Sequence, residues 1–187
     1  IEIIGIISNC YLIGTSKIGL VLIDQHAAHE RVIFERLLKD YSNDKTFQEL
    51  LIPIPIELTK AEFRFIGKHI DKFKELGFFI DIFGENSILV VGIPNSLKMD
   101  NVSGLISDIL NALMEDNDYC RKPDKEVLAK YACKQAIKAN DKISLLEAKQ
   151  LIIDLSKCTI PYSCPHGRPT IIHISQSELE KRFGIKI

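Results

Sequence analysis

The side chains with the most chemistry in this chain gather in a few short segments. The first, Asp24-Gln25-His26-Ala27-Ala28-His29-Glu30, follows the apolar run 20–23, so it lies where a predicted buried strand passes into a predicted helix. His26 and Glu30 are four residues apart, which on a helix places them one turn apart on one face, where they can share a metal ion. Asp24, at the end of the strand, can reach the same ion. The alternative is that Asp24 caps the helix and the other polar residues form a solvated first turn.

The second segment, Cys164-Pro165-His166-Gly167-Arg168-Pro169, places a thiol two residues from an imidazole. Cysteine and histidine are both good ligands for zinc. The two prolines stiffen the segment, Gly167 lets the backbone turn, and Arg168 carries a planar set of donors suited to phosphate. Taken alone, a segment of this kind is more often a structured turn than a site.

A third segment, Ala132-Cys133-Lys134, lies within the stretch 124–140, which is predicted to be helical. Alanines along this stretch would let another backbone approach closely. Lysines recur every four residues and form a basic ridge: Lys130, Lys134 and Lys138. By spacing alone, a solvated helix face is the more common meaning of such a ridge.

The composition is that of a globular protein with nearly balanced charge. Apolar residues make up 46% and charged residues 26%, and the net charge is −1. A strongly basic balance would favour autonomous DNA binding through counterion release, so a DNA substrate would here need a further tether. No apolar run is long enough to span a bilayer, no secretory leader is visible, and the start at Ile1 without Met suggests an excised fragment. The five cysteines, an odd number, do not indicate a disulfide framework.

Hydrophobic periodicity predicts a mixed α/β chain of the α+β class. One or two strands are expected over residues 2–14, and single strands over residues 20–23, 78–83, 88–93 and 170–174. Helices are expected over residues 27–41, 59–77, 101–114, 124–140 and 144–157, with a short last helix capped by Ser177. Capping boxes begin two of these helices, Thr59-x-x-Glu62 and Ser144-x-x-Glu147. Pro53 and Pro55 make the stretch 47–58 extended and demote any strand there to a sheet edge.

The order of these elements predicts two lobes. Residues 43–120 have their own helices and hairpin, and they are expected to form an inserted lobe. Residues 1–42 and 121–187 are expected to form a discontinuous lobe, with 27–41 as the connecting helix.

The combined segments resemble the C-terminal endonuclease domain of the MutL family of mismatch repair proteins. Residues 24–35 match the family signature DQHA-x2-E-x4-E, with Glu30 and Glu35 as its acids. Ala132-Cys133-Lys134 resembles the family's ACR motif with Lys in place of Arg, and residues 164–169 match its C-P-H-G-R-P motif. One departure is the family's terminal F-x-R motif: Phe183-Gly184-Ile185 lacks the Arg, although Arg182 stands just before it.

The resemblance implies a metal-dependent nickase of duplex DNA, in which metal-activated water attacks a phosphodiester. Relatives commonly hold zinc structurally and manganese, or magnesium, for activity. The implied ligands are Asp24, His26, Glu30, Cys133, Cys164 and His166, the first three of them catalytic. Implied supporting residues are Gln25, Glu35 and Lys134. The candidate phosphate or DNA contacts are Arg168, for its planar set of donors, and the basic ridge of Lys130, Lys134 and Lys138.

The resemblance also implies partners. Gln48-Glu49-Leu50-Leu51-Ile52-Pro53 is similar to a motif by which some MutL proteins bind the replication sliding clamp, with Gln48, Leu51 and Pro53 as the docking residues. The alternative is an edge strand with a proline stop. Family members form homodimers through this domain, and the segment 1–13 with the C-terminal helices offers apolar surface for this. MutS and the family's N-terminal ATPase domain are further implied partners, and the implied location is cytoplasmic and nucleoid-associated, with no membrane.

A second function stays open, which is a non-catalytic dimerisation and partner-docking module whose zinc is structural. The acids Asp24, Glu30 and Glu35 favour the nuclease, because a structural zinc site needs only Cys or His ligands.

Overall fold

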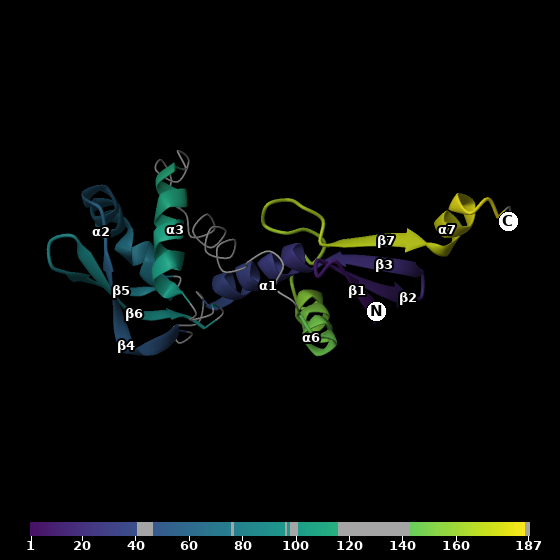
Figure 1. Ribbon diagram of the computed structural model, residues 1–187, viewed down its shortest axis with the longest axis horizontal. Coiled ribbons are helices and arrows are strands. Elements are labelled where there is room, and N and C mark those ends of the chain that lie inside the picture. Colours follow the sequence, from purple (N-terminus) through teal and green to yellow (C-terminus); the bar gives the residue numbers. More distant parts are fainter. Residues whose placement is uncertain (41–46, 76, 96, 98–100, 116–142, 186–187) are drawn as a thin grey trace. The chain divides into compact units, whose positions relative to one another are not determined.

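The computed structural model describes residues 1–40, 47–75, 77–95, 97, 101–115 and 143–185. The chain divides into two compact units, Ile1–Val32 with Ile137–Ile187, and Ile33–Ala136. Each unit holds one antiparallel sheet accompanied by helices, which confirms the predicted α+β class (Figure 1). The boundaries of the predicted lobes, 42/43 and 120/121, stay a prediction.

The first unit is built on a four-stranded antiparallel sheet in the order β1-β2-β3-β7. Its strands are β1 (Glu2–Ile7), β2 (Tyr11–Ser16), β3 (Gly19–Asp24) and β7 (Ile171–Ser175). The predicted strand region 2–14 is therefore two strands, which reverse at Ser8 and Asn9, both with a φ of 52°. Neighbouring strands follow one another through short turns, except that β7 arrives from the far end of the chain to pair with β3.

The core of this unit lies between one face of the sheet and two helices, α1 (Gln25–Asp40) and α6 (Leu145–Ser156). Its buried members are Leu12, Val21, Ile23, Ala28, Val32, Ala148, Leu151 and Leu155. The capping box predicted at Ser144 is present: the Ser144 hydroxyl accepts from the Glu147 N–H, and the Glu147 carboxylate accepts from the Ser144 N–H. α1 continues into the second unit, where its residue Leu37 joins the other core.

The second unit holds a three-stranded sheet in the order β4-β6-β5, formed by β4 (Phe47–Glu57), β5 (Phe79–Phe83) and β6 (Ser87–Pro94). Helices α2 (Lys60–Glu75) and α3 (Val102–Glu115) accompany it, and their apolar residues share its buried core. β4 is an edge strand, as its two prolines predict. The capping box predicted at Thr59 is also present, with the Thr59 N–H donating to the Glu62 carboxylate at 2.7 Å.

Two predicted helix starts differ from the structure. α1 begins at Gln25 rather than at residue 27, because Asp24 supplies the cap. The last helix, α7 (Gln176–Arg182), is capped by Ser175, whose hydroxyl accepts from the Glu178 N–H; Ser177, the predicted cap, already lies in the first turn. The helix predicted over 124–140 lies outside the described residues.

No helix in the described ranges combines the length and the apolar character needed to cross a bilayer.

Candidate metal centre

The junction between β3 and α1 presents the first group of polar side chains. Asp24 ends β3, and its Oδ1 accepts the backbone N–H of Ala27 at 2.9 Å, which satisfies one of the donors left over at the helix start. The backbone N–H of Asp24 donates to the Thr170 carbonyl at 3.0 Å, and that of Gln25 to the Cys10 carbonyl at 2.9 Å. The start of α1 is thereby held on both sides by neighbouring chain segments.

The segment 163–169 forms a closed loop that delivers the second group. Ser163 and Pro169 form an isolated antiparallel bridge at the base of the loop. Inside it, the Cys164 N–H donates to the Arg168 carbonyl at 2.8 Å, and the Gly167 N–H donates to the Cys164 carbonyl at 2.9 Å. Gly167 has a φ of +84°, a conformation that favours glycine. The loop therefore has a defined shape, with the Cys164 side chain turned to the interior and 2% exposed.

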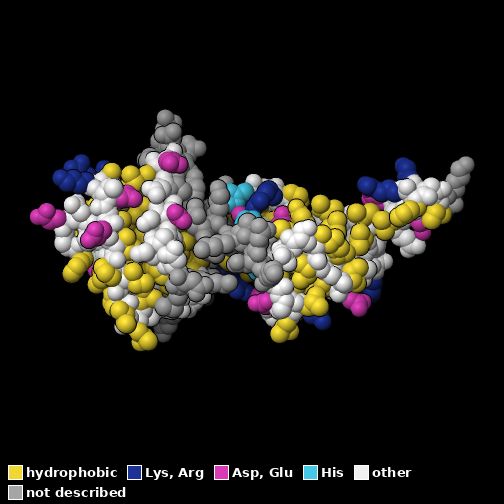
Figure 2. All heavy atoms as spheres, viewed as in Figure 1, with side chains coloured by type: hydrophobic (Ala, Val, Ile, Leu, Met, Phe, Trp, Pro, Cys, Tyr) yellow, Lys and Arg dark blue, Asp and Glu magenta, His cyan; other side chains and the backbone are white. Residues whose placement is uncertain are grey.

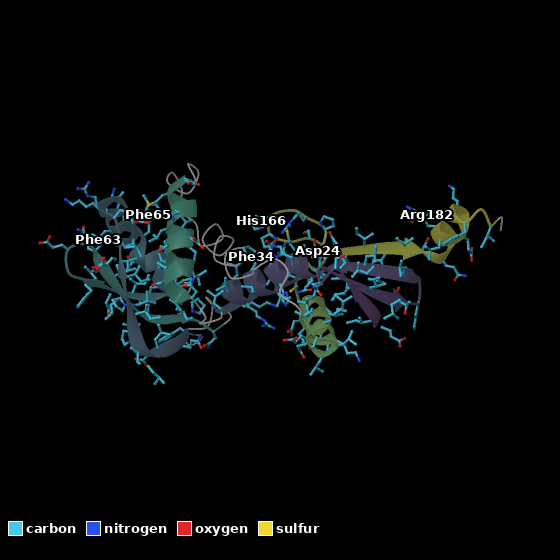
Figure 3. All side chains as sticks on the ribbon, in the orientation of Figure 1. Asp24, Phe34, Phe63, Phe65, His166 and Arg182 are labelled. Atoms are coloured by element: carbon cyan, nitrogen blue, oxygen red, sulfur yellow. The ribbon has the colours of Figure 1, made fainter. Side chains whose placement is uncertain are left out.

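Glu30 on α1 is where helix and loop meet. Its side chain is 1% exposed, and its Oε1 lies 3.2 Å from the Nε2 of His26 one helical turn earlier. Its Oε2 lies 3.3 Å from the Nδ1 of His166 and accepts from the Nη2 of Arg168 at 3.0 Å. Figure 3 labels His166, on the loop before β7, and Asp24, at the start of α1. One other residue of α1, His26, and two residues of the loop, His166 and Arg168, thus converge on the buried carboxylate of Glu30.

These contacts decide the charge of Glu30. Burial by itself raises the pKa of a carboxyl group, because the charged form loses its hydration. Hydrogen bonds from Arg168 and Cys164, together with the charges of His166 and Arg168, outweigh that effect and hold the pKa of Glu30 below its usual value. Glu30 is therefore an ionised acceptor at neutral pH.

Glu30, Cys164 and His166 form a group suited to a metal ion, since one ligand atom from each lies within 4.8 Å of the others. The set offers one oxygen, one sulfur and one nitrogen, which fits a borderline ion such as zinc and leaves room for harder ligands. A further observation is consistent with a cation-binding role for this group. The Nδ1 of His26 is buried and has no hydrogen-bond partner in the described part of the chain, although His26 touches Glu30 through its other ring nitrogen.

The structure brings only some of the predicted ligands together. Glu30, Cys164 and His166 form the group, His26 adjoins it through Glu30, and Arg168 is half exposed beside it. Asp24 is engaged as a helix cap, which is the alternative that the sequence left open, and it is not part of the group.

None of the predicted supporting residues Gln25, Glu35 and Lys134 is part of this group of ligands as described. Gln25 is buried at the first position of α1, and Glu35 is buried in the second unit, with its Oε2 3.9 Å from the Nζ of Lys39. The segment 132–134 and the basic ridge lie outside the described residues, and this includes Lys130, Cys133, Lys134 and Lys138.

Sequence reasoning missed Arg31. This arginine is 6% exposed, and its Nε donates to the Ser163 carbonyl at 2.6 Å, at the base of the loop. A signal for it was available, because Arg31 stands three and four residues after Ala28 and Ala27, on the stripe of α1 that faces the core. Thr170 is also buried, and its hydroxyl donates to the Pro161 carbonyl, which closes the segment before β7.

The fold and this group of ligands together define a mixed α+β domain with a candidate metal centre at a strand-to-helix junction. Residues 4–143 match the family described as the MutL C terminal dimerisation domain. The chain belongs to this family.

Curated relatives agree with this assignment. The chain is 35% identical to the DNA mismatch repair protein MutL of Halothermothrix orenii over 189 residues, which cover 99% of this chain and 29% of that protein. It is 42% identical to the DNA mismatch repair protein MutL of Symbiobacterium thermophilum, over 96% of this chain and 29% of that protein. It is 39% identical to the protein of the same name from Desulforamulus reducens, over 96% and 28%. The chain therefore spans less than a third of the length of these relatives.

Proposed function

We propose that this chain is the part of a DNA mismatch repair protein that dimerises and nicks duplex DNA in a metal-dependent reaction. The repair role rests on the names of the relatives. The nuclease activity rests on one observation, the buried and ionised Glu30 that meets Cys164 and His166 from a segment more than 130 positions away.

The ligand set divides by chemistry. Cys164 and His166 suit zinc, and the carboxylates Glu30 and Asp24 suit a harder ion such as manganese or magnesium. A bound divalent ion supplies Lewis acidity for the attack of water on a phosphodiester. Asp24 would contribute through its second carboxylate oxygen, since its Oδ1 holds the Ala27 N–H.

Residues around Glu30 have separate tasks in this proposal. His26 contacts the Oε1 of Glu30 and so holds the carboxylate plane, while its buried Nδ1 offers one more ligand atom. Arg168 is 50% exposed while its Nη2 lies 3.0 Å from the Oε2 of Glu30, so its remaining donors can meet a DNA phosphate next to the centre. Arg168 would thus hydrogen-bond both to Glu30 and to the phosphate, and so hold the phosphate next to the candidate metal ligands.

A second candidate function is a non-catalytic dimerisation module in which the metal is structural. The observation that favours it is that the group of three contains a single carboxylate, while Asp24 already serves as a helix cap. A structural zinc site does not require a further carboxylate that is free to bind a second ion, so the group of Glu30, Cys164 and His166 also fits such a site.

Nicking of supercoiled plasmid with manganese separates the two functions. Asparagine caps a helix as well as aspartate does, so Asp24→Asn should preserve the start of α1 and remove only the charged ligand. We expect this variant to keep its fold and lose nicking, while Asp71→Asn, an exposed matched change on α2, nicks normally. Normal nicking by Asp24→Asn at matched manganese would remove Asp24 from the mechanism. Zinc binding without nicking by the unaltered protein would support the structural module.

The dimer contact is proposed for the outer face of the first sheet, the face opposite its core. Directly paired residues of antiparallel strands point to the same side. Ile13, Leu22 and Ile172 are paired in one row across β2, β3 and β7, and Leu20 is paired with Ile174 in the next. Figure 2 shows hydrophobic side chains gathered over β3 and β7. An apolar sheet face of this kind needs a partner, and the family description supports a second copy of this chain.

Docking to the sliding clamp is proposed for β4. The pairing of β4 with β6 shifts between Glu49 and Ile54, so the intervening residues stand out of the regular ladder. Leu51 is 101% exposed and Ile52 is 81% exposed. Two unburied aliphatic side chains on an edge strand are suited to a groove on another protein. Because a chain with a net charge of −1 attracts DNA only weakly, binding to a clamp on the DNA would also hold the domain close to its substrate.

A further inference from the structure

Arg31 is a buried cation that the proposed mechanism does not use. It directly follows Glu30 on α1 and is 6% exposed. Burying an arginine costs free energy unless its donors are satisfied. Its Nε donates to the Ser163 carbonyl at 2.6 Å, to a residue 132 positions later in the chain. Arg31 therefore donates a hydrogen bond to the backbone of the loop 163–169, which carries the candidate ligands Cys164 and His166.

Ser163 lies at the base of that loop, where its position affects the residues that follow it. It pairs with Pro169 in the bridge that closes the loop, and the next residue, Cys164, sends its N–H to the Arg168 carbonyl at 2.8 Å. Fixing the Ser163 carbonyl consequently fixes the base from which both the Cys164 and the His166 side chains project.

Glu30 and Arg31 hold the loop at two different places. Consecutive residues on a helix point about 100° apart, so the two side chains leave α1 in different directions. Glu30 contacts the side chains of His166 and Arg168, whereas Arg31 contacts the backbone at Ser163. The contact at the Ser163 backbone therefore restricts movements of the loop that the side-chain contacts with Glu30 leave free.

We propose that Arg31 is a positioning residue that preorganises the metal centre. By holding the Ser163 carbonyl, it keeps Cys164 and His166 at Glu30 before an ion binds. Arg31 touches neither the ion nor the substrate in this proposal, which rests on the metal centre proposed above. Loss of such an outer contact typically weakens metal binding by about 10–100-fold.

Two substitutions of similar length isolate the hydrogen bond. In Arg31→Gln, the side-chain amide nitrogen occupies the same place along the side chain as the arginine Nε, so the donor to Ser163 is kept and the charge is lost. Arg31→Met has a similar length and no donor. Arg36→Met, an exposed arginine on the same helix, is the control.

The probe is cobalt(II), titrated into the metal-free full chain, with the thiolate-to-cobalt absorption band as the signature of a cysteine ligand. Hydrogen exchange of the Cys164 and Gly167 amides, which close the loop, is followed without metal. We expect Arg31→Met to bind cobalt about 10–100-fold more weakly, with faster exchange at both amides. Arg31→Gln and Arg36→Met should both resemble the unaltered protein.

The outcomes separate this proposal from the metal centre itself. Equal affinity and exchange in Arg31→Met would overturn the positioning role and leave the centre intact. Equal weakening in Arg31→Gln and Arg31→Met would also overturn it, because the charge rather than the donor would then matter. If Arg31→Met does not fold, Arg31→Gln alone decides in the same way: weak cobalt binding overturns the proposal, and normal binding supports it. An unaltered protein that binds no cobalt would overturn the centre and, with it, this inference.

Discussion

Glu30 shows at the level of a single residue how a charge can be kept inside this domain. An isolated buried carboxylate would take up a proton, because burial disfavours the charged form. Here the carboxylate faces His26 on one oxygen and both His166 and Arg168 on the other. The partners make the charged form stable, and the same arrangement creates a place where a metal ion could share the negative charge.

The metal-free protein should therefore lose stability in acid through Glu30. A carboxyl group whose pKa is lowered on folding stabilises the fold above its unfolded pKa of 4.5, and that contribution disappears as the pH falls through the folded value. We expect Glu30→Gln to reduce the free energy of unfolding near neutral pH by about 1.5–3 kcal/mol, the usual contribution of hydrogen bonds to a charged group. The deficit should shrink below pH 4.5 in urea titrations with chelator present. A deficit that does not change with pH would contradict this assignment of charge.

At the level of the element, β4 combines two roles along one strand. Leu50 and Ile56 are buried in the core of the second unit, whereas Leu51 and Ile52 are exposed between them. The irregular pairing with β6 makes this possible, because a bulged strand no longer alternates strictly between its two faces. The strand can consequently present apolar side chains to a partner while the core behind it stays intact.

Changing the exposed positions of β4 should affect binding and spare the fold. We expect Gln48→Ala with Leu51→Ala to weaken binding to the sliding clamp by about 2 kcal/mol, as for a lost anchor residue. Because Leu51 is 101% exposed, the thermal midpoint should change little. The matched control is Ile82→Ala on β5, which is 50% exposed on the other edge strand. Affinity would be measured by surface plasmon resonance with immobilised clamp. An unchanged affinity would remove the segment 48–53 from the proposal.

At the level of the whole molecule, the first sheet carries apolar side chains on both faces. One face is covered by α1 and α6, and on the opposite face Tyr11, Ile7 and Ile172 are each about half exposed, at 50%, 51% and 51%. A face of this kind is stable in water when a second surface covers it. A symmetric contact between two copies would do so, with each copy offering the same patch.

A charge placed at the centre of that face should separate the dimer. We expect Leu22→Asp, in the middle strand pair, to shift the mass measured by sedimentation from dimer to monomer, because an unpaired carboxylate would be buried at the contact. Ile82→Asp on β5 in the second unit, at a position that is 50% exposed, is the control and should stay dimeric. A Leu22→Asp variant that remains folded and dimeric would move the contact to another surface.

The sequence by itself determined the features that depend on neighbouring residues. The capping boxes at Thr59 and Ser144 and the hairpin of β5 and β6 were predictable, since each rests on contacts between residues close together in the chain. The edge position of β4 was predictable because its two prolines have no backbone N–H to donate to a neighbouring strand. The order of three short motifs was enough to indicate the family, which the family comparison confirmed.

Only the tertiary structure decided which motif residues meet. The contact between Glu30 and His166 spans 136 positions, and it depends on β7 pairing with β3 and on the closed shape of the preceding loop. Motif spacing could not distinguish Asp24 as a ligand from Asp24 as a cap, because both roles place a carboxylate at the same helix start. It also could not reveal the bond from Arg31 to Ser163, because the partner is a backbone carbonyl, and every residue carries one.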